Sequence, residues 1–160
     1  MTSQMGMRIG FHSSALHSHP LEDAIDRVAA AGYDAIEFNA EDIPWAPAHV
    51  TPAVTTDQRT RLRRRAQDAG IAISAIGGHI SLVEADPEQR RANLDYALGC
   101  IDLAADVGAT VDHIFSGMAP EGVPSEDAWA WLVDGAARCI ERGQSRGVTV
   151  GFEPVATQFV

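Results

Sequence analysis

The chain has few basic residues and no long apolar run. It carries 12 basic residues against 22 acidic ones, for a net charge of −10. This charge repels phosphate backbones, so we expect no nucleic-acid partner. The apolar stretches fall well short of the roughly 18 residues that a membrane span needs, and the first ten residues lack the pattern of a signal peptide. We therefore expect a cytoplasmic protein with no membrane partner.

Cysteines and nucleotide-binding glycine motifs are also scarce. The two cysteines, Cys100 and Cys139, stand among small apolar residues in predicted helices, which indicates buried free thiols rather than a disulfide or a metal pair. No GxGxxG or P-loop motif follows a predicted strand, which weakens the case for a nucleotide-binding sheet. We interpret the basic run as the solvated face of a helix, with phosphate binding as the alternative; it consists of Arg59, Arg61, Arg63, Arg64 and Arg65.

A junction between a helix and a strand recurs along the chain. In each copy an amphipathic helix ends in a glycine and a short β-rich run follows. The glycines, spaced by 38, 38 and 39 residues, are Gly32, Gly70, Gly108 and Gly147. Glycine is preferred at the left-handed position after a helix, and a period of this size indicates one repeated supersecondary unit. The length suits one core, so we predict a single domain over 1–160.

The repeat predicts strands over 8–11, 35–38, 72–76, 111–115 and 149–153. Helices are predicted from Pro20, over 57–69, from Asp86 and after Ser125. In the last helix we expect an apolar stripe to face the core; it consists of Trp129, Leu132, Val133, Ala136 and Ile140. Strands that alternate with helices form a parallel sheet. The predicted class is therefore α/β, as an open doubly wound sheet or a (β/α)8 barrel.

Polar side chains collect where the predicted strands end, which is where parallel α/β folds place their function. These ends carry five of the six histidines. Histidines and carboxylates that converge suit a divalent metal and proton transfer. Glu153 is the strongest candidate, since an unpaired carboxylate is costly to bury and a metal or a salt bridge would offset that cost. Structural roles remain open for His12, Glu37, His113 and Trp45.

The order of these segments resembles the xylose-isomerase-like TIM barrels. That superfamily includes sugar-phosphate isomerases and epimerases and the apurinic endonucleases related to endonuclease IV. The segments are MRIGFHS, GYDAIEFN, IAISAIGGHISL, GATVDHIFSGM and GVTVGFEPV. The resemblance implies a partial (β/α)8 TIM barrel, about four and a half βα units that end after strand five, as the N-terminal portion of a complete barrel.

The resemblance also implies a sugar or sugar-phosphate isomerase or epimerase that uses a divalent metal (Mn, Mg, Co or Zn) and enediolate-type proton transfer. Glu153 matches the strand-five glutamate, which is a metal ligand and takes part in the proton transfer. The other ligands expected in the family, Asp, His and Glu of strands six to eight, have no counterpart before Val160. Substrate contacts are implied for His12, Phe11, Glu37, Trp45 and His79, with Phe11 and Trp45 as an apolar wall.

Two alternatives stay open beside this reading. One is a metal-dependent phosphodiesterase like endonuclease IV, which has histidine ligands after strands three and four. His79 matches the first, but no histidine stands at Phe115-Ser116-Gly117 for the second. The other alternative is a non-catalytic fragment or half-barrel that must assemble with another chain, because its edge strands are unpaired. The expected partner is a small-molecule sugar, and a homo-oligomer is compatible with this role.

Overall fold

Strands and helices alternate along the chain, which confirms the predicted α/β class. The computed structural model describes residues 7–160, so most of the segment in which we predict no signal peptide lies outside the described residues. The strands are β1 (Gly10–His12), β2 (Ala35–Asn39), β3 (Ala72–Gly77), β4 (Val111–Ile114) and β5 (Thr149–Phe152). The helices are α1 (Leu21–Ala30), α2 (Thr56–Ala69), α3 (Pro87–Val107) and α4 (Ser125–Arg146), with a short 3-10 helix η1 (Ser13–Leu16) after β1.

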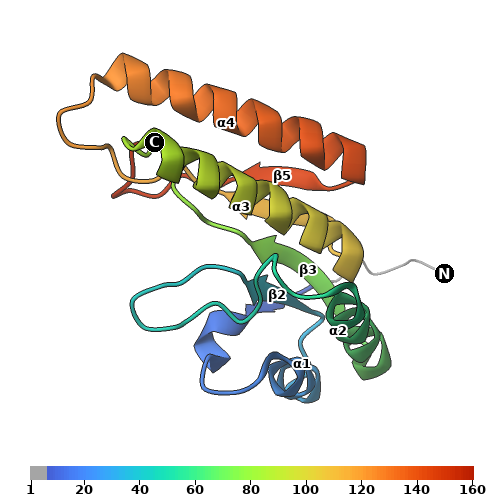
Figure 1. Ribbon diagram of the computed structural model, residues 1–160. Helices are drawn as coiled ribbons and strands as arrows, with labels where there is room; N and C mark the ends of the chain where they lie inside the picture. The colour runs from blue at the N-terminus through green and yellow to red at the C-terminus, as the bar shows by residue number, and fades with distance from the viewer. Residues whose placement is uncertain (1–6) are drawn as a thin grey trace.

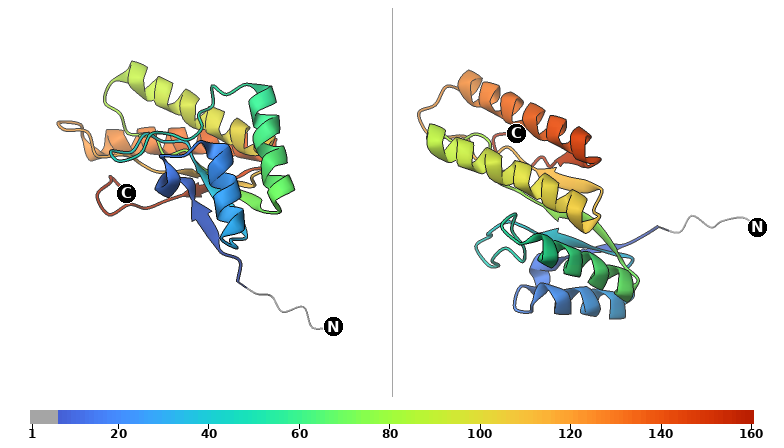
Figure 2. Two further views of the ribbon diagram at one scale, coloured as in Figure 1. Left: turned by 90° about the horizontal axis from the view of Figure 1, so that it is seen from below. Right: turned by 45° about the vertical axis from the view of Figure 1, so that its right-hand side comes forward.

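The five strands form one parallel sheet in the order β1-β2-β3-β4-β5. Each neighbour in space is the next strand along the chain, so every helix is a crossover between adjacent strands. Right-handed crossovers of this kind place all helices on the same face. Figure 1 shows α3 and α4 side by side over one part of the sheet, and Figure 2 shows α1 and α2 paired over the other. The opposite face is left for polar side chains.

Glycine ends each repeat as the period predicts. Gly32, Gly70, Gly108 and Gly147 have φ of +85°, +73°, +86° and +70°. After α2, α3 and α4 the glycine is the left-handed cap, and its N–H donates to a carbonyl of the last helical turn. This cap satisfies carbonyl groups that the end of a helix leaves unpaired. The chain then turns directly into the next strand.

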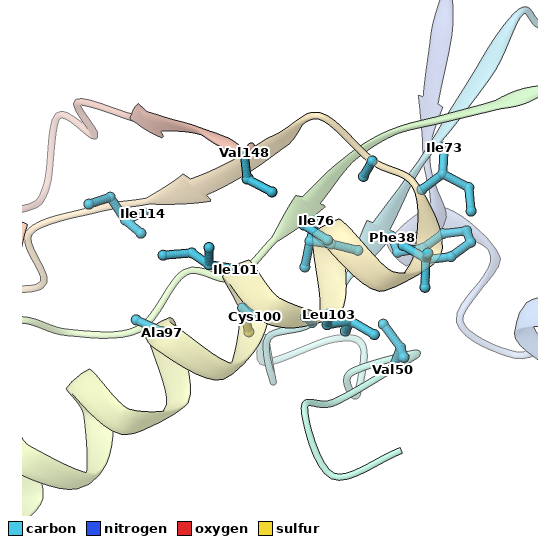
Figure 3. Close-up of a cluster of buried hydrophobic side chains, with 14 of the residues drawn as sticks. Phe38, Val50, Ile73, Ile76, Ala97, Cys100, Ile101, Leu103, Ile114 and Val148 are labelled. Atoms are coloured by element: carbon cyan, nitrogen blue, oxygen red, sulfur yellow. The ribbon is translucent and has the colours of Figure 1, made fainter. Parts of the chain in front are cut away.

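The core lies between the sheet and the helices. Figure 3 shows α3 residues, among them Cys100, Ile101 and Leu103, close to Ile76 of β3 and Ile114 of β4. These side chains are at most 2% exposed. Cys100 and Cys139 are free and buried, which confirms their predicted state. None of the helices formed by residues 7–160 combines the length and the apolar composition that a membrane crossing requires.

Helix α4 buries Leu132 as predicted, but most of its buried stripe differs from the predicted one. Trp129, Val133 and Ile140 are 52%, 51% and 48% exposed, so their predicted core position is wrong. The buried stripe is Ala128, Leu132, Gly135, Cys139 and Gly143. A Cβ at Gly143 would lie 2.6 Å from the Val148 carbonyl oxygen. The helix therefore packs on its smallest residues, because only that side lets the backbone approach the sheet closely.

The basic run of α2 faces solvent except at its first member, as predicted for a solvated helix face. Arg59 is half-buried and donates to Asp106 of α3 at 2.7 Å and to the Val54 carbonyl at 3.2 Å. Arg65 pairs with Asp26 of α1. These arginines link α2 to its two neighbours.

We predict that Gly117→Ala destabilises the fold much more than Gly122→Ala. Both glycines have positive φ, +87° and +75°, and this backbone costs an L-residue roughly 1–2 kcal/mol. A Cβ at Gly117 would also lie 2.0 Å from Ser81 Oγ, whereas nothing lies within 4 Å at Gly122. Overpacking adds about 1–3 kcal/mol. Urea unfolding of both variants measures the difference, and equal losses would contradict the clash at Gly117.

Candidate functional site

A row of polar side chains and glycines crosses the sheet face that the helices leave open. His12 of β1 is aligned with Glu37 of β2. Further along, Gly77 of β3, His113 of β4 and Gly151 of β5 are aligned with one another. Because side chains alternate across a strand, these aligned residues share one face. His113, for which the sequence left the direction open, therefore points to the same face as His12 and Glu37.

Two glycines make room for the ionisable side chains of this row. A Cβ at Gly77 would lie 3.3 Å from both Glu37 Oε1 and His12 Nε2. A Cβ at Gly151 would lie 2.9 Å from His113 Cδ2. Any larger residue at Gly151 would displace the imidazole of His113. The glycines thus form the floor on which the polar groups meet.

His79 follows β3 and lies between two carboxylates. Its Nδ1 is 3.3 Å from Glu41 Oε1, and its Nε2 is 2.9 Å from Glu153 Oε2. The ring also packs edge-on against Phe115, with centroids 5.4 Å apart. The Nε2 atom is buried, and despite its short distance to Glu153 it makes no hydrogen bond with good geometry within residues 7–160. It therefore has a lone pair or a proton available for a further group.

His113 and His12 surround Glu37. His113 Nδ1 forms a 2.9 Å hydrogen bond with Glu37 Oε1, and His12 Nε2 lies 4.0 Å from the same oxygen. The other ring nitrogen of His12 is held by the hydroxyl of Ser14 at 2.7 Å. The rings of His79 and His113 are stacked with centroids 6.0 Å apart. One carboxylate thus joins β1, β2 and β4.

The arrangement offers three donor atoms to a metal ion. One donor atom each from His79, His113 and Glu153 lies within 4.8 Å of the others. Both imidazoles have Nδ1 beside a glutamate, Glu41 or Glu37, and so present Nε2 to the space between them. Metal-binding histidines usually hold their second nitrogen in this way, because it fixes the tautomer and the ring. The donor set therefore fits a divalent transition metal.

The carboxylates and imidazoles shift one another's pKa values. Burial opposes the ionisation of Glu37, but the hydrogen bond and the charge of His113 outweigh it and lower the Glu37 pKa. Burial likewise opposes the charge of His79, yet Glu41 and Glu153 raise its pKa. The hydrogen bond to Glu37 raises the pKa of His113. Such mutual shifts at a cleft are typical of functional sites.

A cavity of about 270 Å³ opens beside His79 and Glu153. Trp45, from the loop after β2, lines it together with Phe115 and Val155. Trp45 is 70% exposed, so one side of its ring faces the cavity and much of the rest faces solvent. The lining combines carboxylate and imidazole groups with aromatic carbon, a combination that suits a polyhydroxylated ligand.

The structure brings together five of the six residues singled out from sequence. His12, Glu37, His79 and Glu153 meet at the cluster, and Trp45 lines the adjoining cavity. Phe11 is not among them, because its ring packs at 5.1 Å against Tyr33 and on the core. The site also includes His113, whose role the sequence left open, and Glu41, to which the sequence assigned no role. Strand parity would have placed His113 beside Glu37 once the register was known.

The chain is similar to solved structures of sugar epimerases. An L-ribulose 3-epimerase matches with a TM-score of 0.69 at 24% identity, over 94% of this chain and 50% of its own. A D-psicose 3-epimerase gives 0.70 at 20%, over 90% and 51%. A 3-keto-D-glucoside 4-epimerase from E. coli gives 0.76 at 13%, over 96% and 58%. The likeness confirms a partial TIM barrel, and the chain spans about half the length of these relatives.

Sequence comparison identifies a family. None of the curated proteins matches the chain. The family model described as "Xylose isomerase-like TIM barrel" matches residues 25–160. This range includes four of the five strands and the residues Glu37, His79, His113 and Glu153. The chain therefore belongs to the xylose isomerase-like TIM barrel family.

Proposed function

We propose that this chain carries the metal-binding half of a sugar isomerase or epimerase. The observation that supports it most is the pair of imidazoles, each held at Nδ1 by a glutamate, whose free nitrogens converge with Glu153. The substrate is a ketose or its phosphate. The epimerases among the similar structures act on ketoses such as D-psicose and L-ribulose.

The donor set favours some divalent metals over others. Two nitrogens and one carboxylate oxygen suit Zn, Co and Mn, whereas Mg prefers oxygen ligands. His79, His113 and Glu153 would hold the ion, and a ligand from outside the chain described would complete its coordination. A bound cation would act as a Lewis acid that polarises the sugar carbonyl. His79 then serves as a ligand rather than as the substrate contact implied by resemblance.

The remaining groups orient the sugar and move a proton. Glu153 takes the proton from the carbon next to the carbonyl, which gives an enediolate, and returns it to the neighbouring carbon in an isomerisation. Epimerisation needs a second acid, from outside the described residues, that protonates the original carbon from the opposite face. It is half-exposed, so it can reach a sugar in the cavity. His12, at the edge of the row of polar side chains, donates or accepts a hydrogen bond with a hydroxyl group of the sugar. Trp45 contacts the C–H face of the sugar and excludes water from it.

Removal of the metal tests this proposal. We expect the natural protein to purify with a stoichiometric divalent metal, and chelation to abolish interconversion of D-fructose, D-psicose, D-tagatose or L-ribulose. Addition of Mn, Co or Zn should restore the activity. Metal content is measured by mass spectrometry and turnover by chromatography of the sugars. Full activity after chelation, or no turnover of any ketose by the metal-loaded protein, would contradict the assignment.

One observation favours a second function. His113 supplies from within β4 a second histidine next to His79, although no histidine stands at Phe115-Ser116-Gly117, where the endonuclease pattern has one. Two histidines and a glutamate also suit metal-dependent phosphodiester hydrolysis, as expected for the endonuclease branch. The net charge of −10 opposes a DNA substrate. Hydrolysis of bis(p-nitrophenyl) phosphate or cleavage at an abasic site, without sugar turnover, would favour this alternative.

Activity belongs to the protein in which the barrel is complete. Within residues 7–160, β1 and β5 are the edges of the sheet, and three βα units would close an eight-stranded barrel. Those units would come from the same polypeptide or from another chain. The cytoplasmic location and the homo-oligomer stay predictions.

A further inference from the structure

A second cavity lies on the helical side of the sheet, between α3 and α4. Its volume is about 410 Å³, and its lining includes the apolar residues Leu82 and Leu94 and the guanidinium groups of Arg90, Arg91 and Arg138. Figure 2 shows the two helices side by side, away from the open face of the sheet. The cavity shares no lining residue with the one beside Glu153. Its size is within the range of small-molecule sites.

Three arginines line this cavity in a chain that is acidic overall. Every one of the 12 basic residues is an arginine, and the net charge is −10. Several arginines are paired with aspartates, including Arg142 and Arg146 further along α4. Arg91 and Arg138 have no acidic group within 4.0 Å in the part of the chain that is described. Asp134 is the one carboxylate that lines the cavity, against three guanidinium groups.

The third arginine is fixed in place and forms a wall. Arg90 lies over the ring of Trp131, with its guanidinium carbon 4.0 Å from the centroid, and it donates to the Glu84 carbonyl. This stacking and this hydrogen bond hold Arg90 and Trp131 together before any ligand binds. Rigid walls reduce the entropy that binding must overcome. The apolar base and the planar Trp131 then favour a ligand with a flat or apolar body.

We propose that this cavity binds a phosphate monoester with a planar body. Two unpaired guanidinium groups match the double negative charge of a phosphate monoester, and the fork of arginine binds phosphate oxygens in pairs. The indole of Trp131 and the leucines of the base contact the body of the ligand. The site is independent of the proposed sugar chemistry, since it lies on the opposite side of the sheet.

Calorimetric titration with phenyl phosphate tests the site in the natural protein. We expect saturable binding that is weaker for inorganic phosphate, which lacks the ring, and weaker for benzoate, which has a single charge. Arg91→Gln and Arg138→Gln should each weaken phenyl phosphate binding by about tenfold or more, because each removes a charged hydrogen bond to the phosphate. Trp131→Leu should reduce the preference for phenyl phosphate over inorganic phosphate.

The control is Arg64→Gln, which removes an exposed arginine from α2 and makes the net charge one unit more negative, as the other arginine variants do. It should bind phenyl phosphate like the wild type. Arg91 and Arg138 are exposed, so their variants should fold normally, as circular dichroism will check. Absence of binding, equal weakening by Arg64→Gln, or tighter binding of benzoate than of phenyl phosphate would overturn the proposal.

Discussion

Replacement of Glu153 by glutamine is expected to lower ketose turnover by about 10³-fold, because a positioned acid–base group typically contributes 10²–10⁴. Glutamine keeps the shape of the side chain but cannot accept a proton. It also removes the negative charge 2.9 Å from His79 Nε2, so the affinity for zinc should fall by tenfold or more. Turnover is measured on the ketose panel, and zinc affinity by competition with a chromophoric chelator.

The matched control for this variant is Glu121→Gln. Glu121 is exposed in the loop before α4, so its replacement should change neither turnover nor metal affinity. The fold should survive both changes, because Glu153 is also partly exposed, and substitutions at such sites usually alter stability within about 0.5 kcal/mol. A Glu153→Gln protein with wild-type turnover would rule out proton transfer by this carboxylate.

The repeat made the architecture predictable. Each left-handed glycine of the repeat marks the end of a helix and shows that a strand begins two or three residues later. Gly70 is an example, because it ends α2 and β3 begins at Ala72. Strand ends were less certain. β1 begins at Gly10 and ends at His12, two residues and one residue beyond the predicted ends, because its short apolar run gives no sharp boundary and pairing with β2 decides it.

Site residues that follow the end of a strand could be predicted from their place in the sequence. Site residues within a strand could not, because the sequence does not show which face their side chains point to. Glu153 and His79 follow strands, so the end of the strand carries them to the open face. Phe11 and His113 lie within strands, where a shift of one residue reverses the direction of the side chain. The observed register turns His113 toward Glu37 and Phe11 toward Tyr33. Periodicity without a register cannot separate these cases.

The same limit applies to the helices. The apolar residues of α4 cover more than half of its circumference, and their spacing fits either of two neighbouring stripes. The glycines decide between them, since Gly135 and Gly143 let the helix approach its neighbours. A stripe of small residues was therefore the stronger signal for the buried side than the large apolar residues Trp129 and Val133.

The second large effect that we expect concerns Asp112, which lies on the core side of β4. Its side chain is 0% exposed, and neither carboxylate oxygen has a hydrogen-bond partner within residues 7–160. A Cβ at Gly78 would lie 3.0 Å from Asp112 Oδ1 and 2.8 Å from Cys100 Cβ, so the carboxyl group is enclosed beside a thiol. Burial raises the Asp112 pKa from 3.8 to about 8.

This shift makes the fold less stable as the pH rises. Between pH 4 and pH 8 the native state keeps a proton on Asp112 that the unfolded state has released. Stability therefore falls through this range. The contribution at pH 7 amounts to about 4 kcal/mol at 1.36 kcal/mol per pKa unit. The raised pKa values of His79 and His113 act in the same direction at higher pH, and the lowered pKa of Glu37 acts in the opposite direction in acid.

Asp112→Asn isolates this contribution, because asparagine has the same shape and does not ionise. We expect the free energy of unfolding of the variant, relative to wild type, to increase by about 4 kcal/mol from pH 4 to pH 7. Urea unfolding at a series of pH values measures it. Asp95→Asn, at an exposed position of α3, is the control and should follow the wild-type curve, because its side chain is in water in both states. Parallel curves for Asp112→Asn and wild type would contradict the raised pKa, because they would show that the buried carboxyl group has a partner in the folded state.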